Sequence, residues 1–191
     1  MATDTSSEQF FEAKYAACAD PWQFATSRYE RERYAAIVGA LGGRRYRRAF
    51  EPGCSIGILT FKLAAMCDAI EAMDISPTAA ARARKRCEAF GHVTVAQGKL
   101  PADVPAGFFD LIVFSEIGYY FEPAVLGQIG TQLVDHLNSH GVFLVAHWLG
   151  DSPDHRLKGD QVHALLGGLP GIERTLAEKH GQFRIERWIR I

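Results

Sequence analysis

The stretch Ala49-Phe50-Glu51-Pro52-Gly53-Cys54-Ser55-Ile56-Gly57-Ile58-Leu59-Thr60 decides the fold of this 191-residue chain. Its pattern predicts the end of a β-strand, a tight glycine-containing loop and the start of a helix. Glycine has no Cβ, so a loop of this kind lets a ligand approach the backbone closely. Backbone amides also point outward at the start of the following helix. We therefore expect a ligand to bind at this loop.

Strand and helix patterns alternate on both sides of the loop. Helices are expected at residues 8–19, 27–41, 59–66, 77–89, 122–137 and 158–166. Strands are expected to end at residue 50 and to span residues 69–74, 92–96, 109–114, 142–146, 172–177 and 183–191, with a break at Gly141. This order predicts an α/β fold with a doubly wound, Rossmann-like sheet of seven mostly parallel strands and an antiparallel C-terminal strand pair. In such a sheet, ligands bind outside the carboxyl ends of the strands.

The composition is that of one folded globular domain. Hydrophobic residues make up 48% of the chain, which is enough for a full core, and the formal net charge of −1 gives no reason to expect a nucleic acid or an anionic membrane as partner. The N-terminal residues lack the apolar segment of a signal peptide, and no apolar run reaches the ~20 residues of a transmembrane helix. The four cysteines have no zinc-site spacing. We expect a cytoplasmic protein without a metal.

The residues around the loop argue against a dinucleotide. A dinucleotide fingerprint needs three glycines in the loop, but Ser55 replaces the second and Ile58 stands at the third position. Glu51 places a carboxylate at the mouth of the loop, where a pyrophosphate would be repelled. Asp74, by contrast, ends the second strand at the spacing of an acid that binds a ribose. S-adenosylmethionine (SAM), which joins an adenosine ribose to an ammonium and a sulfonium, fits this pattern.

Three motifs resemble those of the class I SAM-dependent methyltransferases. Residues Glu51 to Gly57 are similar to the first motif of that family, an acidic residue followed by Gly-x-Gly-x-Gly, with Ser55 at the middle glycine. Asp74-Ile75-Ser76 resembles the ribose-binding second motif, and Asp110 to Glu116 resembles the fourth. The order and spacing of all three match over about residues 45–150.

A narrower resemblance is to the NodS group, rhizobial methyltransferases that N-methylate the free amine of a deacetylated chitooligosaccharide. It rests on Asp20-Pro21-Trp22, Tyr29-Glu30-Arg31-Glu32-Arg33 and Glu116-Ile117-Gly118-Tyr119-Tyr120. The residues up to about Ser7 are expected to form a disordered tail, and the resemblance implies a helical lid within residues 1–43. It also implies a SAM-binding methyltransferase domain at residues 44–191.

The resemblance further implies which residues bind SAM and its product S-adenosylhomocysteine (SAH). Asp74 would bind the ribose, and Ile75 would cover one face of the adenine. Arg33, on the lid, would pair with the methionyl carboxylate, and Trp22 would close over the site. The other residues expected at the cofactor are Glu51, Gly53, Cys54, Gly57, Gln97, Gly98, Lys99 and Ser115.

Four residues at the ends of the fourth and fifth strands are candidates for the acceptor side. Glu116 would bind a substrate amine or accept its proton. Tyr119 and Tyr120 would flank the transferred methyl group and stack on a sugar ring, unless they are core aromatics. His147 is expected to face the same crevice as a general base, and a hydrogen-bonded structural histidine is the alternative. The polar cluster that follows has no assigned role and contains Asp151, Asp154, His155 and His163.

The sequence therefore predicts a SAM-dependent methyltransferase, in the first place an N-methyltransferase of an amino sugar or a similar small polar amine. O-, C- or S-methylation of another small molecule stays open, as does a SAM-binding module without catalysis. The expected partner is a small-molecule acceptor, such as an oligosaccharide amine, with no nucleic acid and no membrane. The chain is expected to be a monomer or a homodimer.

Overall fold

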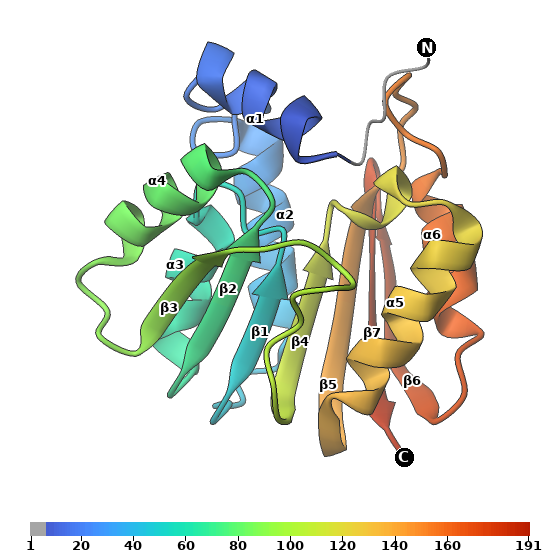
Figure 1. Ribbon diagram of the computed structural model, residues 1–191. Coiled ribbons are helices and arrows are strands. Elements are labelled where there is room, and N and C mark those ends of the chain that lie inside the picture. Colours follow the sequence, from blue (N-terminus) through green and yellow to red (C-terminus); the bar gives the residue numbers. More distant parts are fainter. Residues whose placement is uncertain (1–6) are drawn as a thin grey trace.

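The computed structural model describes residues 7–191, which form a seven-stranded sheet flanked by helices (Figure 1). The strands are β1 (Ala49–Pro52), β2 (Ile70–Asp74), β3 (Val93–Gln97), β4 (Phe109–Ser115), β5 (Leu137–Trp148), β6 (Ile172–His180) and β7 (Phe183–Arg190). They lie in the order β3-β2-β1-β4-β5-β7-β6. The first five strands are parallel, and β7 pairs antiparallel with both β5 and β6. The predicted Rossmann-like fold is confirmed.

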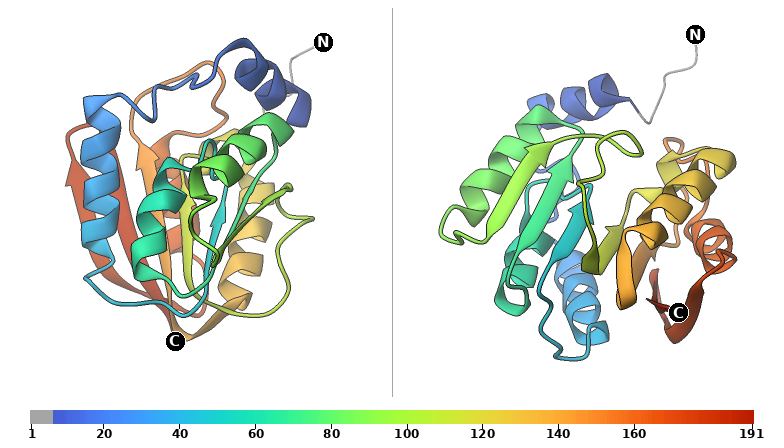
Figure 2. Two further views of the ribbon diagram at one scale, coloured as in Figure 1. Left: turned by 90° about the vertical axis from the view of Figure 1, so that its left-hand side faces the viewer. Right: turned by 60° about the horizontal axis from the view of Figure 1, so that its bottom comes forward.

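Helices cover both faces of the sheet, as the alternation predicts (Figure 2). They are α1 (Glu8–Ala17), α2 (Arg28–Ala40), α3 (Ile58–Leu63), α4 (Pro77–Cys87), α5 (Pro123–Asp135) and α6 (Gly159–Gly167), with the 3₁₀ turns η1 (Ala64–Met66) and η2 (Gly118–Tyr120). α2, α3 and α4 pack against one face, and α5 and α6 pack against the other. α1 lies above the carboxyl ends of the strands, against α4 (Figure 1).

The strand β4 shows how two apolar layers hold the middle of the sheet. All its residues except the last are buried, as expected of a parallel strand covered on both faces. Leu111 and Val113 belong to the core beneath α2 and α3, whereas Ile112 and Phe114 belong to the core beneath α5 and α6. Because side chains alternate between the two layers, the strand is packed on both faces. This packing fixes its last residue, Ser115, at the carboxyl ends of the strands, where a ligand is expected.

Two local predictions differ from the structure. The predicted break at Gly141 is wrong, because β5 continues through this residue. The interruption is instead an irregularity in the pairing with β4, between Phe109 and Leu111, and His140 has a φ of 60° there. The predicted helix at residues 59–66 begins one residue earlier and ends as the 3₁₀ turn η1.

Hydrogen bonds from the middle and the C-terminal end of α1 to α4 fix this helix over the carboxyl ends of the strands. Glu12 accepts hydrogen bonds from the hydroxyl of Ser76 (2.6 Å) and the backbone amide of Thr78 (3.2 Å), at the N-terminus of α4. Arg82 of α4 donates to three backbone carbonyls at the end of α1, at 3.0 to 3.3 Å. The first helix is therefore docked by its polar groups as well as by its aromatic face.

The predicted unit at residues 1–43 combines two structural parts. α2 buries Ile37 fully within the core, so this helix is a layer of the main fold. The segment with α1 lies over the ligand edge, and its action as a lid stays a prediction. Ser7, from the predicted tail, caps α1 by accepting a hydrogen bond from the amide of Phe10 (3.3 Å), and residues 1–6 lie outside the described residues.

Among residues 7–191, none of the helices has the length and apolar character needed to cross a membrane. The four cysteines carry free thiols, and three of them are buried. The cytoplasmic location stays a prediction.

Candidate active site

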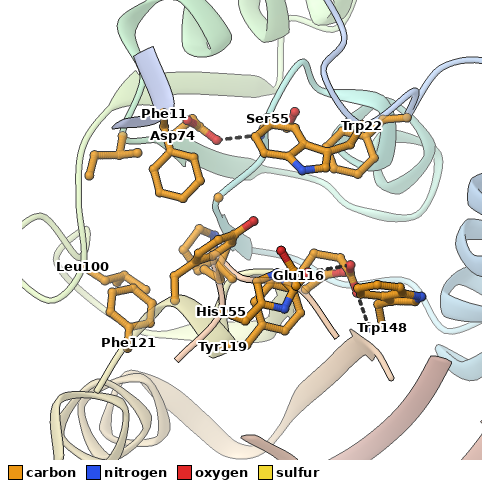
Figure 3. A pocket seen from close by; sticks show the side chains of 18 of the residues that line it. Phe11, Trp22, Ser55, Asp74, Leu100, Glu116, Tyr119, Phe121, Trp148 and His155 are labelled. Carbon is orange, nitrogen blue, oxygen red and sulfur yellow. Dashed lines mark hydrogen bonds between the residues drawn. The ribbon is translucent and has the colours of Figure 1, made fainter. Parts of the chain in front are cut away.

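A cavity of about 620 Å³ opens at the carboxyl ends of the parallel strands, a size typical of small-molecule sites. Figure 3 shows Ser55, Asp74 and Trp22 on one side of it and Glu116, Tyr119, His155 and Trp148 on the other. Most of the predicted site residues line this cavity: Trp22, Gly53, Asp74, Ile75, Gly98, Lys99, Ser115, Glu116, Tyr119 and Tyr120.

A smaller pocket of about 30 Å³ adjoins the cavity at Gly53, Ser115 and Glu116. It takes in three further predicted residues, Arg33, Glu51 and Cys54. The remaining three, Gly57, Gln97 and His147, line neither space. Within residues 7–191, no three His, Cys, Asp or Glu side chains are grouped so as to hold a metal ion.

The two glycines of the loop occupy positions where a side chain would collide. Gly53 has a φ of +73°, and a Cβ there would lie 2.4 Å from Cγ2 of Ile117. Gly57 has a φ of +77°, and a Cβ there would lie 2.9 Å from the Cα of Ala83. Gly53 therefore lets the loop pass close to the end of β4 at the cavity, whereas Gly57 lets α3 and α4 pack closely. Direct contact of Gly57 with a cofactor stays a prediction.

Asp74 ends β2 at the cavity wall and orders the glycine loop. Its Oδ2 accepts a hydrogen bond from the amide of Ser55 (2.8 Å), and its Oδ1 accepts one from the amide of Ser76 (2.9 Å). Burial raises the pKa of this carboxyl group to about 6, although both hydrogen bonds oppose the rise. Tyr15 of α1 donates its hydroxyl to Oγ of Ser55 (2.5 Å). Helix, loop and strand thus meet beside the predicted ribose-binding acid.

An apolar slot lies next to Asp74, at the ends of β2 and β3. Met73, Ile75 and Leu100 line the cavity there. Gly98 lies close by, and a Cβ on it would be 3.1 Å from Sδ of Met73. Gln97, in contrast, is exposed, and its side-chain amide donates to the carbonyl of Ile75 (3.5 Å) outside the cavity. The slot has the apolar character that an adenine ring needs, and Gln97 does not reach it.

Glu51 is a buried carboxylate with no cation beside it. It is 4% exposed, at the wall of the smaller pocket, and its Oε2 has no hydrogen-bond partner within the described part of the chain. Burial raises the pKa of this group to about 8, although the hydroxyl of Thr60 beside it opposes the rise. Leaving a buried polar atom unpaired destabilises a protein. A ligand that donates a hydrogen bond, and above all a cationic one, would satisfy this atom, whereas a phosphate would be repelled.

Arg33 is held by protein groups. Its guanidinium donates to Glu30 through Nε (3.1 Å) and Nη2, and to Oγ of Ser115 through Nη1 (2.9 Å). Nη1 also lies 3.3 Å from Oε1 of Glu116. Burial lowers the pKa of the guanidinium, but the carboxylates of Glu116 and Glu30 outweigh burial and raise it. Arg33 therefore fixes the end of β4, and its predicted pairing with a ligand carboxylate stays a prediction.

Glu116 carries the carboxyl group on the opposite wall, directly after β4. Its φ of 60° is rare for a residue other than glycine. Oε1 accepts a hydrogen bond from the amide of Trp148 (2.6 Å), and Oε2 accepts one from the hydroxyl of Tyr119 (2.7 Å). These contacts, with Arg33 alongside, hold an unfavourable backbone conformation that places the carboxyl group at the cavity wall.

His147 does not face the cavity, and that expectation is wrong. The residue is fully buried, and its Nε2 accepts a hydrogen bond from the amide of Gly118 (3.0 Å). Burial lowers the pKa of this imidazole well below its usual range. The reason is that β5 extends to Trp148, so His147 lies beneath α6, its ring 5.4 Å from that of His163. His147 supports the turn η2, which carries both tyrosines.

Tyr119 and Tyr120 belong to the core beneath α5 and also to the cavity wall. The ring of Tyr119 stacks on that of His155, with centroids 3.7 Å apart and planes at 18°. Tyr120 packs edge-on against Phe11 of α1, at 4.9 Å. Burial raises the pKa of both phenols, so both keep their protons at neutral pH. The two sequence-based alternatives for these residues, a place in the core and a place at the site, are thus compatible.

His155 and Tyr29 are among the cavity residues that had no role in the sequence-based site. His155, in the loop after β5, is half-buried at the cavity wall, and its only sequence signal is the polar cluster in which it lies. Tyr29 of α2 also lines the cavity, and its buried hydroxyl has no hydrogen-bond partner among the described residues. The conformation of the loop after β5 brings His155 to the cavity, and the rotation of α2 about its axis brings Tyr29 there. Local sequence patterns determine neither.

Aromatic side chains and one ion pair join α1 to both walls of the cavity. Trp22 stacks on Phe24, with centroids 5.7 Å apart, and meets Tyr15 edge-on at 5.4 Å. On the other side, Nζ of Lys14 lies 3.0 Å from Asp154 in the loop after β5. Trp22 is therefore at the cavity as predicted, and its closure over a ligand stays a prediction.

The fold and the site together define a class of protein. A sheet of this order, with a glycine loop after β1 and an acid after β2 at the same edge, is the arrangement of the class I methyltransferase fold. Within that fold, the chain belongs to the Nodulation protein S (NodS) family, which matches residues 3–148. The match includes α1 and ends at the last residue of β5. The family predicted by resemblance is confirmed.

Three relatives illustrate the similarity. The nodulation protein S of Sinorhizobium fredii is 33% identical over 107 residues, which cover 56% of this chain and 50% of that protein, so the chain spans about half the length of this curated relative. A structure from Pseudomonas syringae, solved as a candidate methyltransferase, has 36% identity and a TM-score of 0.76 and covers 86% of this chain and 100% of that one. The N-methyltransferase NodS of Bradyrhizobium japonicum, solved with SAH, shares the fold, with a TM-score of 0.86, 24% identity and coverage of 98% and 99%.

Proposed function

We propose that this protein is a SAM-dependent methyltransferase. The observation that carries the proposal is the buried carboxylate of Glu51, whose Oε2 has no partner in the described part of the chain. A cationic ligand group would favour ionisation of this carboxyl group, which the pyrophosphate of a dinucleotide would oppose, and Asp74 lies at the same edge of the sheet to bind a ribose. Membership of the NodS family and the SAH-bound NodS relative support this proposal.

The residues of the two spaces fit the parts of SAM. Asp74 would hold the ribose, the slot at Ile75 and Leu100 would hold the adenine, and Glu51 would hold the ammonium group. Bound SAM supplies a methyl group on a sulfonium, which is already activated toward a neutral nucleophile. The contribution of this chain is therefore to align the acceptor and to exclude water. The aromatic side chains around Trp22 serve the second purpose.

The acceptor is an amine, in the first place that of an amino sugar or a deacetylated chitooligosaccharide. The carboxyl group of Glu116 lies across the cavity from Asp74 (Figure 3) and offers a partner for an amine. Tyr120 and Trp148 line the same space and offer aromatic faces to a sugar ring. The Bradyrhizobium japonicum relative is described as an N-methyltransferase, which supports an amine over a hydroxyl or a thiol.

Calorimetry with SAH and with NADH tests the cofactor. SAH is expected to bind, and NADH is not. The substitution Asp74→Asn is expected to lower the affinity for SAH at least tenfold, because it removes a charged hydrogen bond to the ribose of about 1.5–3 kcal/mol. Binding of NADH alone would overturn the proposal.

Transfer of labelled methyl groups tests the acceptor. The panel holds glucosamine oligomers, simple amines, a catechol and a thiol. Transfer to the amines is the expected result. Transfer only to the catechol or the thiol would replace N-methylation by O- or S-methylation, and tight SAH binding without any transfer would indicate a binding module.

A further inference from the structure

The imidazole of His155 lies at the acceptor side of the cavity with its ring nitrogens free. The residue lines the cavity and is half-buried. Its ring stacks on Tyr119 at 3.7 Å and meets Tyr120 edge-on at 5.1 Å and Trp148 at 6.1 Å. Within the described part of the chain, no hydrogen bond or ion pair engages either ring nitrogen. The ring is thus held by its faces and edges, and its lone pair remains available.

The backbone fixes this ring as firmly as the stacking does. The amides of Arg156 and Leu157 donate to the carbonyl of Tyr119, at 2.8 and 3.2 Å. The amide of His155 donates to the carbonyl of Ser152 (3.1 Å). The loop after β5 is therefore tied to the turn η2, next to the carboxyl group of Glu116. A group held this way has the fixed position that proton transfer requires.

The other ionisable groups on the acceptor side are engaged or remain protonated. Both oxygens of Glu116 accept protein hydrogen bonds, and burial raises the pKa of Tyr119 and Tyr120 so that they remain phenols. Asp151 pairs with Lys158 at 3.1 Å and Asp154 with Lys14 at 3.0 Å. His147 lies outside the cavity. Among these acceptor-side groups of the described residues, His155 is the one that offers an unoccupied lone pair on a basic nitrogen.

We propose that His155 is the proton acceptor of the methyl-transfer reaction. The inference rests on the proposed function, because an amine that arrives as an ammonium cannot act as a nucleophile. One N–H bond of the ammonium breaks, and its electron pair stays on the amine nitrogen. The lone pair of the imidazole forms the new N–H bond, which gives a neutral amine and an imidazolium. The imidazolium then returns its proton to water through the cavity mouth, so the group is regenerated in each cycle.

The charges around His155 set the pH dependence. Burial lowers the pKa of the imidazole, while the carboxylates of Glu116, Asp154 and Asp151 partly oppose this. Tyr119 and Tyr120 face the ring as neutral phenols, and Asp154 is itself paired with Lys14. The ring is therefore neutral near pH 7. The rate, kcat/KM, should rise with pH until the imidazole has lost its proton and should then level off.

Two variants separate a base from a structural ring. His155→Phe keeps a flat ring for stacking on Tyr119 but has no lone pair, and His155→Gln keeps a polar group of similar length. His180→Gln, at the end of β6 and away from the cavity, is the matched control. All four proteins are compared with glucosamine oligomers and labelled SAM, between pH 5.5 and 9.5, after SAH binding has shown that each is folded.

Both His155 variants are expected to be slower by about 100-fold at pH 7. Their rates should keep rising with pH, without the plateau of the wild type, as the free amine forms in solution. In a fifth protein, His155→Ala, added imidazole should restore part of the lost rate. If His155→Phe kept the wild-type rate and plateau, the inferred role of His155 would be overturned, but the proposed function would not. No methyl transfer by the wild-type protein to any amine would overturn the proposed function, and the inference with it.

Discussion

The unpaired carboxylate of Glu51 makes a prediction about stability that needs no ligand. Its pKa is raised by burial from an ordinary value of 4.5 to about 8, so the folded protein keeps a proton that the unfolded chain loses. Where the folded state binds more protons than the unfolded one, stability falls as pH rises, by about 1.4 kcal/mol for each pH unit. The loss begins near pH 4.5, amounts to about 3 kcal/mol at pH 7 and levels off at about 5 kcal/mol above pH 8.

Glu51→Gln removes this titration while keeping the shape of the side chain. At pH 4.5 the variant should be as stable as the wild type, since both then carry a neutral group. At pH 7 it should be more stable by about 3 kcal/mol, and above pH 8 by about 5 kcal/mol. The measurement is urea unfolding of both ligand-free proteins at pH 5, 6, 7, 8 and 9. The difference between the two free energies of unfolding cancels the titration of all other groups.

We expect the same variant to bind SAH more weakly, because in the proposed function Glu51 ionises on binding and pairs with the ligand's ammonium group. A loss of at least tenfold is expected for one charged hydrogen bond, at about 1.5–3 kcal/mol. In the wild type, binding near pH 7 should release a proton as Glu51 ionises, which calorimetry in buffers of different ionisation enthalpy detects. A constant difference in stability between pH 5 and pH 9 would refute the reasoning, and so would a variant that is stabilised and binds SAH as tightly as the wild type.

Two further predictions concern packing and the position of α1. Gly57→Ala should destabilise the protein by about 2–4 kcal/mol, because it adds a strained positive φ to a collision with Ala83, whereas Gly43→Ala, with a similar φ and open space around it, should cost about 1–2 kcal/mol. Equal losses in thermal or urea unfolding would show that the packing of α3 on α4 is not the cause. The Lys14–Asp154 pair is about one-third exposed on each side, so a double-mutant cycle with Lys14→Met and Asp154→Asn should give a coupling of about 0.2–1 kcal/mol, with faster amide exchange in α1. A coupling near zero, with unchanged exchange, would mean that the pair does not hold the helix.

Local spacing explains why the sequence could place the glycine loop and Asp74 together at one edge of the sheet. The strand, the glycine loop and the helix follow each other directly, and Asp74 lies at the end of the next strand. The crossover between these parallel strands is right-handed, so about 25 residues are enough to determine that the loop and Asp74 lie side by side. The buried run of β4 likewise marked Ser115 and Glu116 as residues at the end of a central strand. The fold class followed from the order of the same elements.

The acceptor side was less predictable because it depends on contacts far apart in the chain. The sequence offered His147 and His155 as histidines near one edge, and which of them faces the cavity depends on β5 ending at Trp148 and on the loop that returns to Tyr119. Arg33 lies at the smaller pocket, and its role toward a ligand stays a prediction; its partners Glu30 and Glu116 depend on how α2 is rotated against β4. No local pattern sets these choices.

The tie between the loop after β5 and the carbonyl of Tyr119 has a consequence for how this enzyme family can diversify. The residues proposed to bind the ribose and the ammonium group come from β2 and β1, whereas residues 149–157 reach the cavity from the other half of the sheet. An insertion or exchange in that loop would reshape the acceptor space and leave the contacts of Asp74 and Glu51 in place. Laboratory chimeras that exchange this segment between relatives are therefore a direct route to new acceptors, with the donor half of the chemistry inherited unchanged.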